Sequence, residues 1–401
     1  MWPRRGVPSV SLMTLQLPPR VLVVGGGVAA LETVLAIQAL AGDRVRVELL
    51  APDRHFTYRP AAVAEPFSAG AVARFPLAAI AADRNVRIHR DAMARVRGLD
   101  RAVETQDGDS LHYDRLVLAL GARAVEGVPG ALTFRGPQDA QRVRAVVDEL
   151  KQSAIRRVVF AVPAGTTWSL PAYELALQTA AAVRGVAPAA RLALVTPEPA
   201  ALAAFGAAAS EAVAVLLADA GVELYTGLVG DELADGELRM GELHLPADRV
   251  IALPRLVGPR PPGVLCDAAG FVPVDEHMRV LDADGIFAIG DIMAGGVKQG
   301  GLATQQADVA AAVIAAEAGA PVAAEPYRPV LRGLLLTGGG VRWLRRDPAG
   351  ESEISPDPLW WPPTKIAGRH LAPYLAAHLD LGAARASERE ARLHHGAAAG
   401  G

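Results

Sequence analysis

The feature that most constrains the fold is a glycine-rich turn near the start of the chain. It follows Arg20–Val24, a β-branched and aliphatic run that predicts a buried parallel strand, and precedes Val28–Ala41, which is rich in helix formers. The turn reads Gly25-x-Gly27-x-x-Ala30. In this pattern the first glycine permits a sharp bend, the second lets backbone approach a pyrophosphate, and the third small residue lets helix and strand pack closely. Free N–H groups at the helix start favour phosphate, so the turn predicts a dinucleotide-binding site.

A second predicted strand, Val45–Leu50, makes this opening a βαβ unit of the doubly wound type. A carboxylate at the end of that strand commonly binds the ribose of the dinucleotide. The position expected for this carboxylate lies close to Ala51, which is not acidic, so the sequence departs from the usual pattern here. We predict that Asp53 binds the ribose. The alternative is Glu48, which can also be interpreted as a surface residue on the strand.

Composition narrows the class of protein. The 401 residues are 51% hydrophobic and 21% charged, which suits two or three globular domains and excludes a largely disordered chain. The net charge of -3 gives no cationic excess for nucleic acid, and no apolar run is long enough to span a membrane. Cys266 is the single cysteine, which excludes an intramolecular disulfide and a cysteine redox pair. We expect a cytoplasmic protein without nucleic-acid partners or a metal site.

The alternation of strands and helices restarts in the middle of the chain. The predicted elements are the strands Arg157–Val162, Leu192–Val195 and Val222–Tyr225 and the helices Pro171–Ala182 and Ala207–Ala220. They indicate a second α/β unit over roughly 155–255. An alanine-rich helix at 303–318 and a β pair at 330–344 follow it.

Two further predicted strands end in glycine. One is Leu116–Leu120, followed by Gly121, and the other leads into Gly290-Asp291. With the first turn, these motifs make residues 20–320 resemble the pyridine nucleotide-disulfide oxidoreductases, flavoproteins with two dinucleotide-binding domains. The resemblance implies FAD as cofactor, with Asp291 on the ribityl chain of the flavin and Gly290 and Gly121 beside the FAD.

Two segments resemble the branch that contains sulfide:quinone oxidoreductases and type II NADH dehydrogenases. They run from Phe56 to Pro60 and from Lys298 through Gly301 and Leu302 to Ala307. The resemblance places Pro60 on the flavin side and aims the helix that begins at Gly301 and Leu302 at the flavin. Its N–H groups and dipole would stabilise the reduced, anionic cofactor.

Lysine is scarce in this chain, since arginine supplies nearly all of its basic residues. Only Lys151, Lys298 and Lys365 are lysines. Lys298 stands just before the helix expected to face the flavin. It is our catalytic candidate, lying over the flavin or its electron acceptor, and the alternative is a solvated loop lysine.

The chain departs from the family pattern in two places. The disulfide reductases and sulfide:quinone enzymes use a cysteine pair beside the flavin, whereas Cys266 stands alone and fits a small buried hydrophobe better than a nucleophile. Sulfide oxidation by the usual chemistry is therefore disfavoured. In the middle unit the strand–helix turn has only Gly165, with Trp168 and Pro171 where a nicotinamide dinucleotide would need glycine. NAD(P)H binding is doubtful there, although the Thr166-Thr167 pair offers donors for a phosphate.

The C-terminal part carries adjacent Trp360 and Trp361, then Lys365, and a predicted last helix at Ile366–Leu379. Four interpretations stay open for this segment: a lid over the flavin, a quinone-contacting surface, a membrane-interface anchor, or packing against the FAD domain or a second subunit. The pair His394-His395 falls in the expected tail and does not predict a metal site.

The sequence therefore predicts an α/β protein with two Rossmann-like three-layer domains, the second inserted into the first. The predicted parts are a disordered leader (1–18), the FAD-binding domain (19–152 and 258–328), a second dinucleotide-type domain (153–257), a C-terminal segment (329–381) and a disordered tail (382–401). The expected function is FAD-dependent two-electron transfer between a small-molecule donor and a quinone-like or other small acceptor. The alternatives are an NAD(P)H dehydrogenase and a flavin-binding redox-sensing or structural subunit. Peripheral membrane contact and a homodimer stay open.

Overall fold

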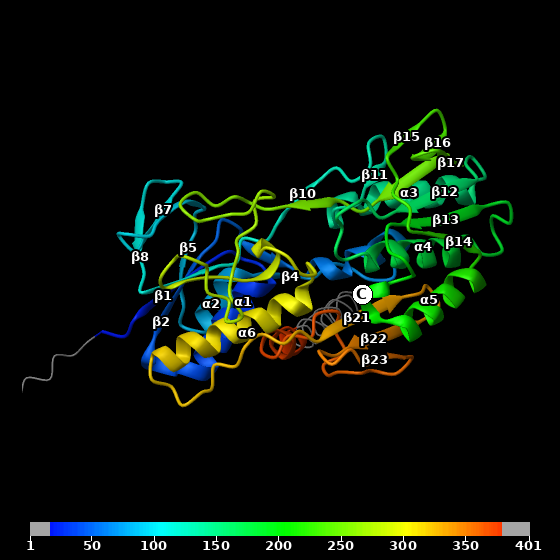
Figure 1. Ribbon diagram of the computed structural model, residues 1–401. Helices are drawn as coiled ribbons and strands as arrows, with labels where there is room; N and C mark the ends of the chain where they lie inside the picture. The colour runs from blue at the N-terminus through cyan, green and yellow to red at the C-terminus, as the bar shows by residue number, and fades with distance from the viewer. Residues whose placement is uncertain (1–16, 379–401) are drawn as a thin grey trace, which may run out of the picture.

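The computed structural model describes residues 17–378 and forms two α/β bodies with a smaller C-terminal part (Figure 1). The tail with His394 and His395 lies outside the described residues, as does most of the predicted leader. No helix within residues 17–378 has both the length and the apolar character needed to cross a membrane.

The first body is a five-stranded parallel sheet. Its strand order is β20 (Ile286–Ala288), β9 (Arg115–Leu118), β1 (Arg20–Val24), β2 (Arg46–Leu50) and β5 (Arg87–His89). Strand β20 pairs with β9 although the whole second body lies between them in sequence, with Phe287 opposite Val117. The second body is thus inserted into the first, which confirms the predicted fold class.

Alternate residues of β1 face opposite layers, which explains why the strand is apolar from Val21 to Val24. Val21 and Val23 pack against helices α1 (Val28–Ala41), α2 (Leu77–Asp83) and α6 (Gly300–Glu317). Leu22 and Val24 pack against a three-stranded antiparallel layer of β6 (Met93–Arg97), β7 (Ala102–Thr105) and β8 (Ser110–His112). A strand buried on both faces has no position for polar alternation.

The second body repeats this three-layer plan. Its parallel sheet has the order β11 (Leu132–Thr133), β18 (Arg249–Ala252), β12 (Arg157–Ala161), β13 (Arg191–Thr196) and β14 (Val222–Thr226). One face packs on α3 (Ala140–Lys151), α4 (Leu170–Val183) and α5 (Ala207–Asp219). The other face is covered by β15 (Glu232–Ala234), β16 (Glu237–Met240) and β17 (Leu243–Pro246).

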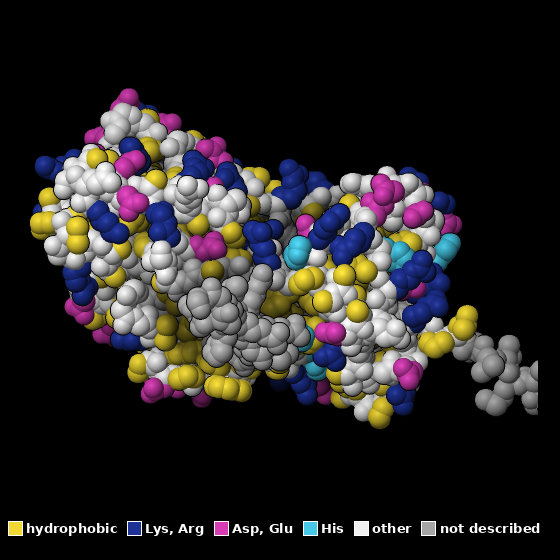
Figure 2. Space-filling view, turned by 180° about the vertical axis from the view of Figure 1, so that it is seen from behind, with side chains coloured by type: hydrophobic (Ala, Val, Ile, Leu, Met, Phe, Trp, Pro, Cys, Tyr) yellow, Lys and Arg dark blue, Asp and Glu magenta, His cyan; other side chains and the backbone are white. Residues whose placement is uncertain are grey.

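The two bodies are joined by a short antiparallel pair of strands, β10 (Arg123–Val125) and β19 (Arg255–Val257). These paired strands carry the chain into and out of the second body, and β10 is labelled between the two bodies in Figure 1. Another small pair, β3 (His55–Thr57) and β4 (Arg74–Pro76), belongs to the first body. On the surface opposite the view of Figure 1, apolar side chains are exposed at several places, some of them between the two bodies (Figure 2).

The C-terminal part contributes to both bodies. Strands β21 (Leu331–Leu336), β22 (Val341–Arg346) and β23 (Ser352–Ser355) form an antiparallel sheet whose Leu335 and Leu344 join the core of the second body. The chain then returns to the first body, where Leu371 and Leu375 join the core formed by α1 and α6.

The predicted start of the last helix is wrong. Residues 366–370 are not helical, and the helix occupies residues 371–378, beyond which the chain is outside the described residues. The backbone N–H groups of Ile366 and His370 are bonded to Tyr58 and Glu32, acceptors that belong to the first body. These distant acceptors hold the segment in a non-helical path that local helix propensity does not reveal.

Candidate functional site

The glycine-rich turn has the shape that a pyrophosphate requires. Gly25 has φ of +130°, and a Cβ at this position would lie 2.2 Å from the backbone oxygen of Ala119. Gly27 is the N-cap of α1, and a Cβ there would meet nothing within 4 Å. Ala30 is fully buried in the helix–sheet contact. The first N–H groups of α1 have no partner within the helix, so the open space beside Gly27 fits a phosphate group.

The first sheet brings Gly290 and Asp291 to this turn. Gly290 has φ of +77°, and a Cβ there would lie 3.1 Å from Cβ of Ala29 at the start of α1. Its N–H group donates to Oε1 of Gln306 at 2.7 Å, which ties the strand end to α6. The Asp291 carboxyl group reaches a cavity beyond this contact, where burial raises its pKa and nearby Lys298 partly offsets the rise. A carboxyl group in this position suits hydrogen bonding to hydroxyl groups of a ligand.

The other predicted dinucleotide contacts lie at the carboxyl ends of strands. Gly121 follows β9 with φ of +69°, and Asp53 is exposed just after β2. The alternative, Glu48, is not a surface residue on the strand. It is 5% exposed in the middle of β2 and pairs with Nε2 of His89 at 2.7 Å and with Nε of Arg20 at 3.3 Å. Because these groups occupy its carboxylate, Glu48 is a structural ion-pair centre.

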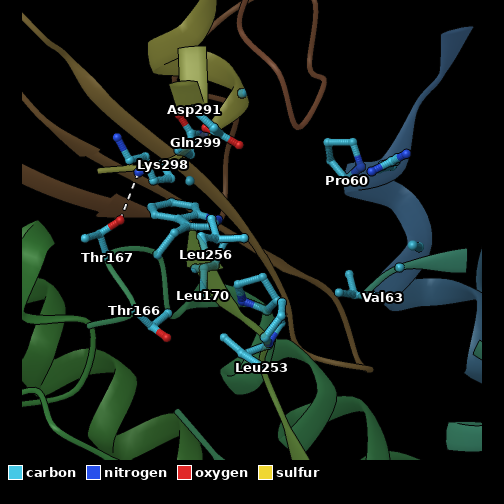
Figure 3. A pocket seen from close by; sticks show the side chains of 18 of the residues that line it. Pro60, Val63, Thr166, Thr167, Leu170, Leu253, Leu256, Asp291, Lys298 and Gln299 are labelled. Atoms are coloured by element: carbon cyan, nitrogen blue, oxygen red, sulfur yellow. Dashed lines mark hydrogen bonds between the residues drawn. The ribbon is translucent and has the colours of Figure 1, made fainter. Parts of the chain in front are cut away.

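A cavity of about 460 Å³ opens where the three parts of the chain meet. Figure 3 shows Asp291, Gln299 and Lys298 grouped together, with Pro60 and Val63 across the cavity. The wall contributed by the second body includes Thr166, Thr167, Trp168, Leu170 and Leu253, and the C-terminal part adds Leu334, Lys365 and Ile366. Apolar side chains form the larger part of the lining, and charged residues such as Arg59 and Arg135 also border the cavity.

Lys298 matches neither of the two sequence interpretations fully. Its Nζ donates to the backbone oxygens of Met293 and, at 2.8 Å, of Gly295, and lies 4.5 Å from the ring centre of Phe271. Its backbone N–H donates to Oγ1 of Thr167 at 3.0 Å, which links the two bodies (Figure 3). Burial lowers the pKa of the Lys298 amine, and Asp291 partly restores it. Lys298 thus lines the cavity as a tethered cation.

Helix α6 begins at Gly300 and directs its first turn at the same cavity. The side chain of Gln299 caps it, accepting from the Leu302 N–H at 2.8 Å and donating to the Arg332 backbone oxygen at 3.1 Å. Leu302 therefore has an internal partner for its N–H group, and its side chain packs in the core of the second body. The dipole end that borders the cavity belongs to Gly300, whereas the predicted contact Gly301 is buried against the Gln299 side chain.

A buried ion pair in the cavity wall was not foreseen from the sequence. Nζ of Lys365 lies 2.5 Å from Oε1 of Glu174 on α4, and the two side chains are 11% and 1% exposed. Oε1 of Glu174 also accepts the Leu336 N–H at 2.9 Å. Burial raises the pKa of Glu174, and Lys365 opposes the rise. The scarcity of lysine pointed to Lys365, whereas the sequence predicted no role for Glu174.

The strand–helix turn of the second body has some features that favour binding of a nicotinamide dinucleotide and others that oppose it. Gly165 has φ of +77° with open space around it, and Oγ1 of Thr166 is buried with no hydrogen-bond partner among the described residues. Trp168 fills the turn and packs on Phe205, with ring centres 5.9 Å apart. Glu198, which the sequence reading overlooked, follows β13 where a ribose-binding carboxylate belongs.

One oxygen of that carboxylate is already engaged within the second body. Oε2 of Glu198 accepts the hydroxyl of Tyr173 at 2.8 Å and that of Thr196 at 2.9 Å. The sequence signal that could have identified Glu198 is its position directly after the second strand of a βαβ unit, where a carboxylate can bind a ribose. The internal bonds leave one oxygen for any ribose.

The tryptophan pair separates into a packed and an exposed residue. The ring of Trp360 meets that of Trp343 edge-on, 4.4 Å between centres, and its Nε1 donates to the Thr364 backbone oxygen at 2.9 Å. Trp361 is 84% exposed. Packing therefore accounts for Trp360 and orders the chain just before Lys365.

Comparison with known sequences now gives the family. A sequence profile described as pyridine nucleotide-disulphide oxidoreductase matches residues 19–311. An NADH dehydrogenase-like protein of Mycobacterium tuberculosis (strain CDC 1551 / Oshkosh) is 32% identical over 221 residues, 50% of this chain and 54% of that protein. The sulfide-quinone reductase of Aquifex aeolicus (strain VF5) is 28% identical over 166 residues, 39% of this chain and 37% of that one. The chain spans about half or less of the length of these relatives.

Solved structures agree on the fold. The sulfide:quinone oxidoreductase of Aquifex aeolicus superposes with a TM-score of 0.75 at 20% identity, covering 84% of this chain and 87% of that one. A ferredoxin reductase of the CYP199A2 system from Rhodopseudomonas palustris gives 0.62 at 21% identity, covering 82% of each chain. The profile match covers most of the chain, including both parts of the first body. The protein therefore belongs to the pyridine nucleotide-disulphide oxidoreductase family of flavoprotein oxidoreductases.

Proposed function

We propose that this protein binds FAD non-covalently and transfers two electrons from a small-molecule donor to a quinone-like or other small acceptor, without a cysteine relay. The observation that carries the proposal is the meeting of the Gly290-Asp291 strand end, the start of α6 and the Lys365–Glu174 ion pair around one apolar cavity. When bound, FAD supplies two-electron redox chemistry that no side chain of this protein provides.

Four features of the chain would hold the cofactor. The α1 N-terminus beside Gly27 suits the pyrophosphate, and Asp291 can accept hydrogen bonds from ribityl hydroxyls. The start of α6 at Gly300 and Gly301 places a positive dipole end at the cavity, which favours negative charge there. Asp53 stays our proposed ribose contact.

Two residues of the cavity wall could also donate and accept the protons that the reaction needs. A quinone-like acceptor takes up protons together with electrons, so a proton donor must reach its oxygens. Lys365 holds a proton on Nζ, and Glu174, 2.5 Å away, lies ready to accept or return one. Apolar neighbours such as Leu253, Leu334 and Ile366 limit water in this part of the cavity, which strengthens the electrostatic effect of the pair.

Cys266 does not lie at the cavity. Its Sγ is 3.5 Å from the backbone oxygen of Val264, and its side chain packs against the antiparallel-layer face of the first sheet. Burial raises the pKa of the thiol, which opposes thiolate formation. Any electron donor would therefore have to act on the flavin without help from this residue.

The proposal is tested by purifying the protein with FAD and comparing wild type with Cys266→Ser in anaerobic reduction followed by reoxidation with a short-chain quinone. We expect close to one FAD per chain and rates that agree within about twofold, since Cys266 is not among the residues that line the cavity. A Cys266→Ser variant that keeps its FAD but loses turnover would show that the thiol takes part. A colourless protein that does not take up FAD would remove the basis of the proposal.

A second candidate is an NAD(P)H dehydrogenase that uses the second body. It is favoured by the unengaged oxygen of Glu198, by the open turn at Gly165, and by the name of the mycobacterial relative. It is opposed by Trp168 and Pro171 in the turn and by the bonds from Tyr173 and Thr196 to Glu198. Rapid bleaching of bound flavin by NADH or NADPH would establish it in place of our first proposal.

A further inference from the structure

A cluster of polar groups lies on the helical side of the first body. It joins Glu32 on α1, Asp308 on α6 and His370 just before the last helix, and their oxygen and nitrogen atoms lie within 4.8 Å of one another. None of the three residues lines the cavity of the proposed flavin site. The proposed function gives them no role, although Glu32 is fully buried.

The carboxylate of Glu32 holds the start of the last helix. Its Oε1 accepts the His370 N–H and its Oε2 accepts the Leu371 N–H, each at 2.7 Å. Gly368 allows this close approach, since a Cβ there would lie 2.6 Å from Oε2. Leu371 is fully buried and Leu375 nearly so. The carboxylate thus caps residues 371–378 from another helix, satisfying N–H groups that a helix start leaves free.

Two carboxyl groups this close cannot both be ionised without cost. Burial, followed by the charge of Glu32, raises the pKa of Asp308 to about 8. Burial also raises the pKa of Glu32, while the His370 and Leu371 N–H groups oppose that rise. The donors favour the charge on Glu32, so at neutral pH it is Asp308 that holds a proton.

The other charged and titratable groups around the cluster also affect these pKa values, but none of them supplies the proton held on Asp308. Arg369 lowers the pKa of Asp308, and burial with the charges of Arg369 and Arg84 lowers the pKa of His370. His370 is therefore neutral at physiological pH, and its Nε2 lies 3.8 Å from Asp308. At the other end of the helix, the Tyr374 hydroxyl, with help from His378 and Arg84, lowers the pKa of Asp83.

We propose that a proton held on Asp308, beside the Glu32 carboxylate, acts as a latch that positions the C-terminal segment, and through it Lys365, at the flavin site. Glu32 and Asp308 are positioning residues, and this role rests on the proposed function. The chain runs from the latched residues back to Ile366, whose N–H donates to the Tyr58 hydroxyl at 3.0 Å, and to Lys365 in its pair with Glu174. Release at residues 370–371 would free this segment to move.

The direction of the pH effect follows from the raised pKa of Asp308. Its carboxyl is protonated in the docked segment up to about pH 8, but a solvated carboxyl loses its proton near pH 4. Docking is therefore strongest below about pH 4 and weakens as pH rises towards 8, because undocking then releases a proton to solvent. One linked proton changes the docking equilibrium by at most about tenfold per pH unit.

Hydrogen exchange on the FAD-loaded protein tests the latch directly. Protection factors of the His370 and Leu371 amides, which already correct for intrinsic exchange, are measured from pH 6 to pH 8 and referred to amides of β12. In wild type we expect a fall that approaches tenfold per unit. In Asp308→Asn we expect protection that stays level over this range. The alkaline limb of the kcat profile should flatten in the same variant.

Two further variants make the outcome unambiguous. Asp83→Ala removes the acceptor of the Tyr374 hydroxyl at 2.7 Å, so it should lower protection of the helix without changing the slope with pH. Glu32→Gln should lower protection at every pH. A level wild-type profile, or a wild-type slope retained in Asp308→Asn, overturns the latch. Missing redox turnover overturns the proposed function instead, because the protection factors do not depend on it.

Discussion

Replacing Lys365 with methionine is expected to lower turnover about 100-fold and to reduce the free energy of unfolding by about 3 kcal/mol. The change removes the cation that lies 2.5 Å from Glu174, whose side chain is 1% exposed. Burial already raises the pKa of Glu174, so the unpaired carboxyl would take up a proton and the wall would lose its charged proton donor. Steady-state turnover with a short-chain quinone and unfolding by urea measure the two effects.

A control variant distinguishes the loss of the buried ion pair from the loss of a positive charge elsewhere on the protein. Lys151 is 40% exposed and lies 3.9 Å from Asp148, so Lys151→Met should change stability by less than about 0.5 kcal/mol and leave turnover intact. The double variant Glu174→Gln with Lys365→Met should regain part of the stability, since no buried carboxylate is left, but not the turnover. Wild-type turnover in Lys365→Met would remove the residue from the mechanism.

Replacing Gly27 with alanine is expected to weaken FAD binding about 10- to 100-fold while leaving the unliganded fold nearly intact. The added methyl group would meet nothing within 4 Å in the protein, and φ of -93° is accessible to alanine. It would instead occupy the space that the pyrophosphate needs and displace it from the N–H groups of α1, at a cost of one or two charge-assisted hydrogen bonds. Titration of the apoprotein with FAD measures the effect.

Alanine substitutions at two other glycines serve as controls for this prediction. Gly98, in the turn between β6 and β7, also has open space around it, so Gly98→Ala should bind FAD as wild type does. Gly25→Ala should damage the fold itself, because its Cβ would lie 2.2 Å from the Ala119 backbone oxygen. Unchanged FAD affinity in Gly27→Ala would move the pyrophosphate site away from this turn.

Features governed by local stereochemistry were predictable from the sequence. Residues Val21 to Val24 are all apolar because both faces of the strand are buried there, and Gly25 is the residue that its φ of +130° requires. The same holds for Gly290, whose φ is +77°. The insertion of the second body into the first was also predictable, because the motifs resemble a family with this domain arrangement. No single strand would have revealed it.

Contacts between distant parts of the chain were not predictable. Glu174 and Lys365 are 191 positions apart, and Glu32 and His370 are 338 positions apart. Neither pair has a local pattern, since a glutamate in an apolar helix gives no sign of the group it meets. The last helix shows the consequence: residues 366–370 have helix-compatible composition, but their N–H groups bond to Tyr58 and Glu32 instead.

The central claim is that this chain carries electrons on FAD without a cysteine and without a nicotinamide cradle. Its most direct test is an anaerobic screen of the FAD-loaded protein for bleaching of the flavin by NADH, NADPH, sulfide and small thiols, followed by reoxidation with a short-chain quinone. We predict slow or absent bleaching by NADH and NADPH, faster bleaching by a donor from outside that pair, and reoxidation by the quinone. Rapid bleaching by NADH or NADPH would contradict this account.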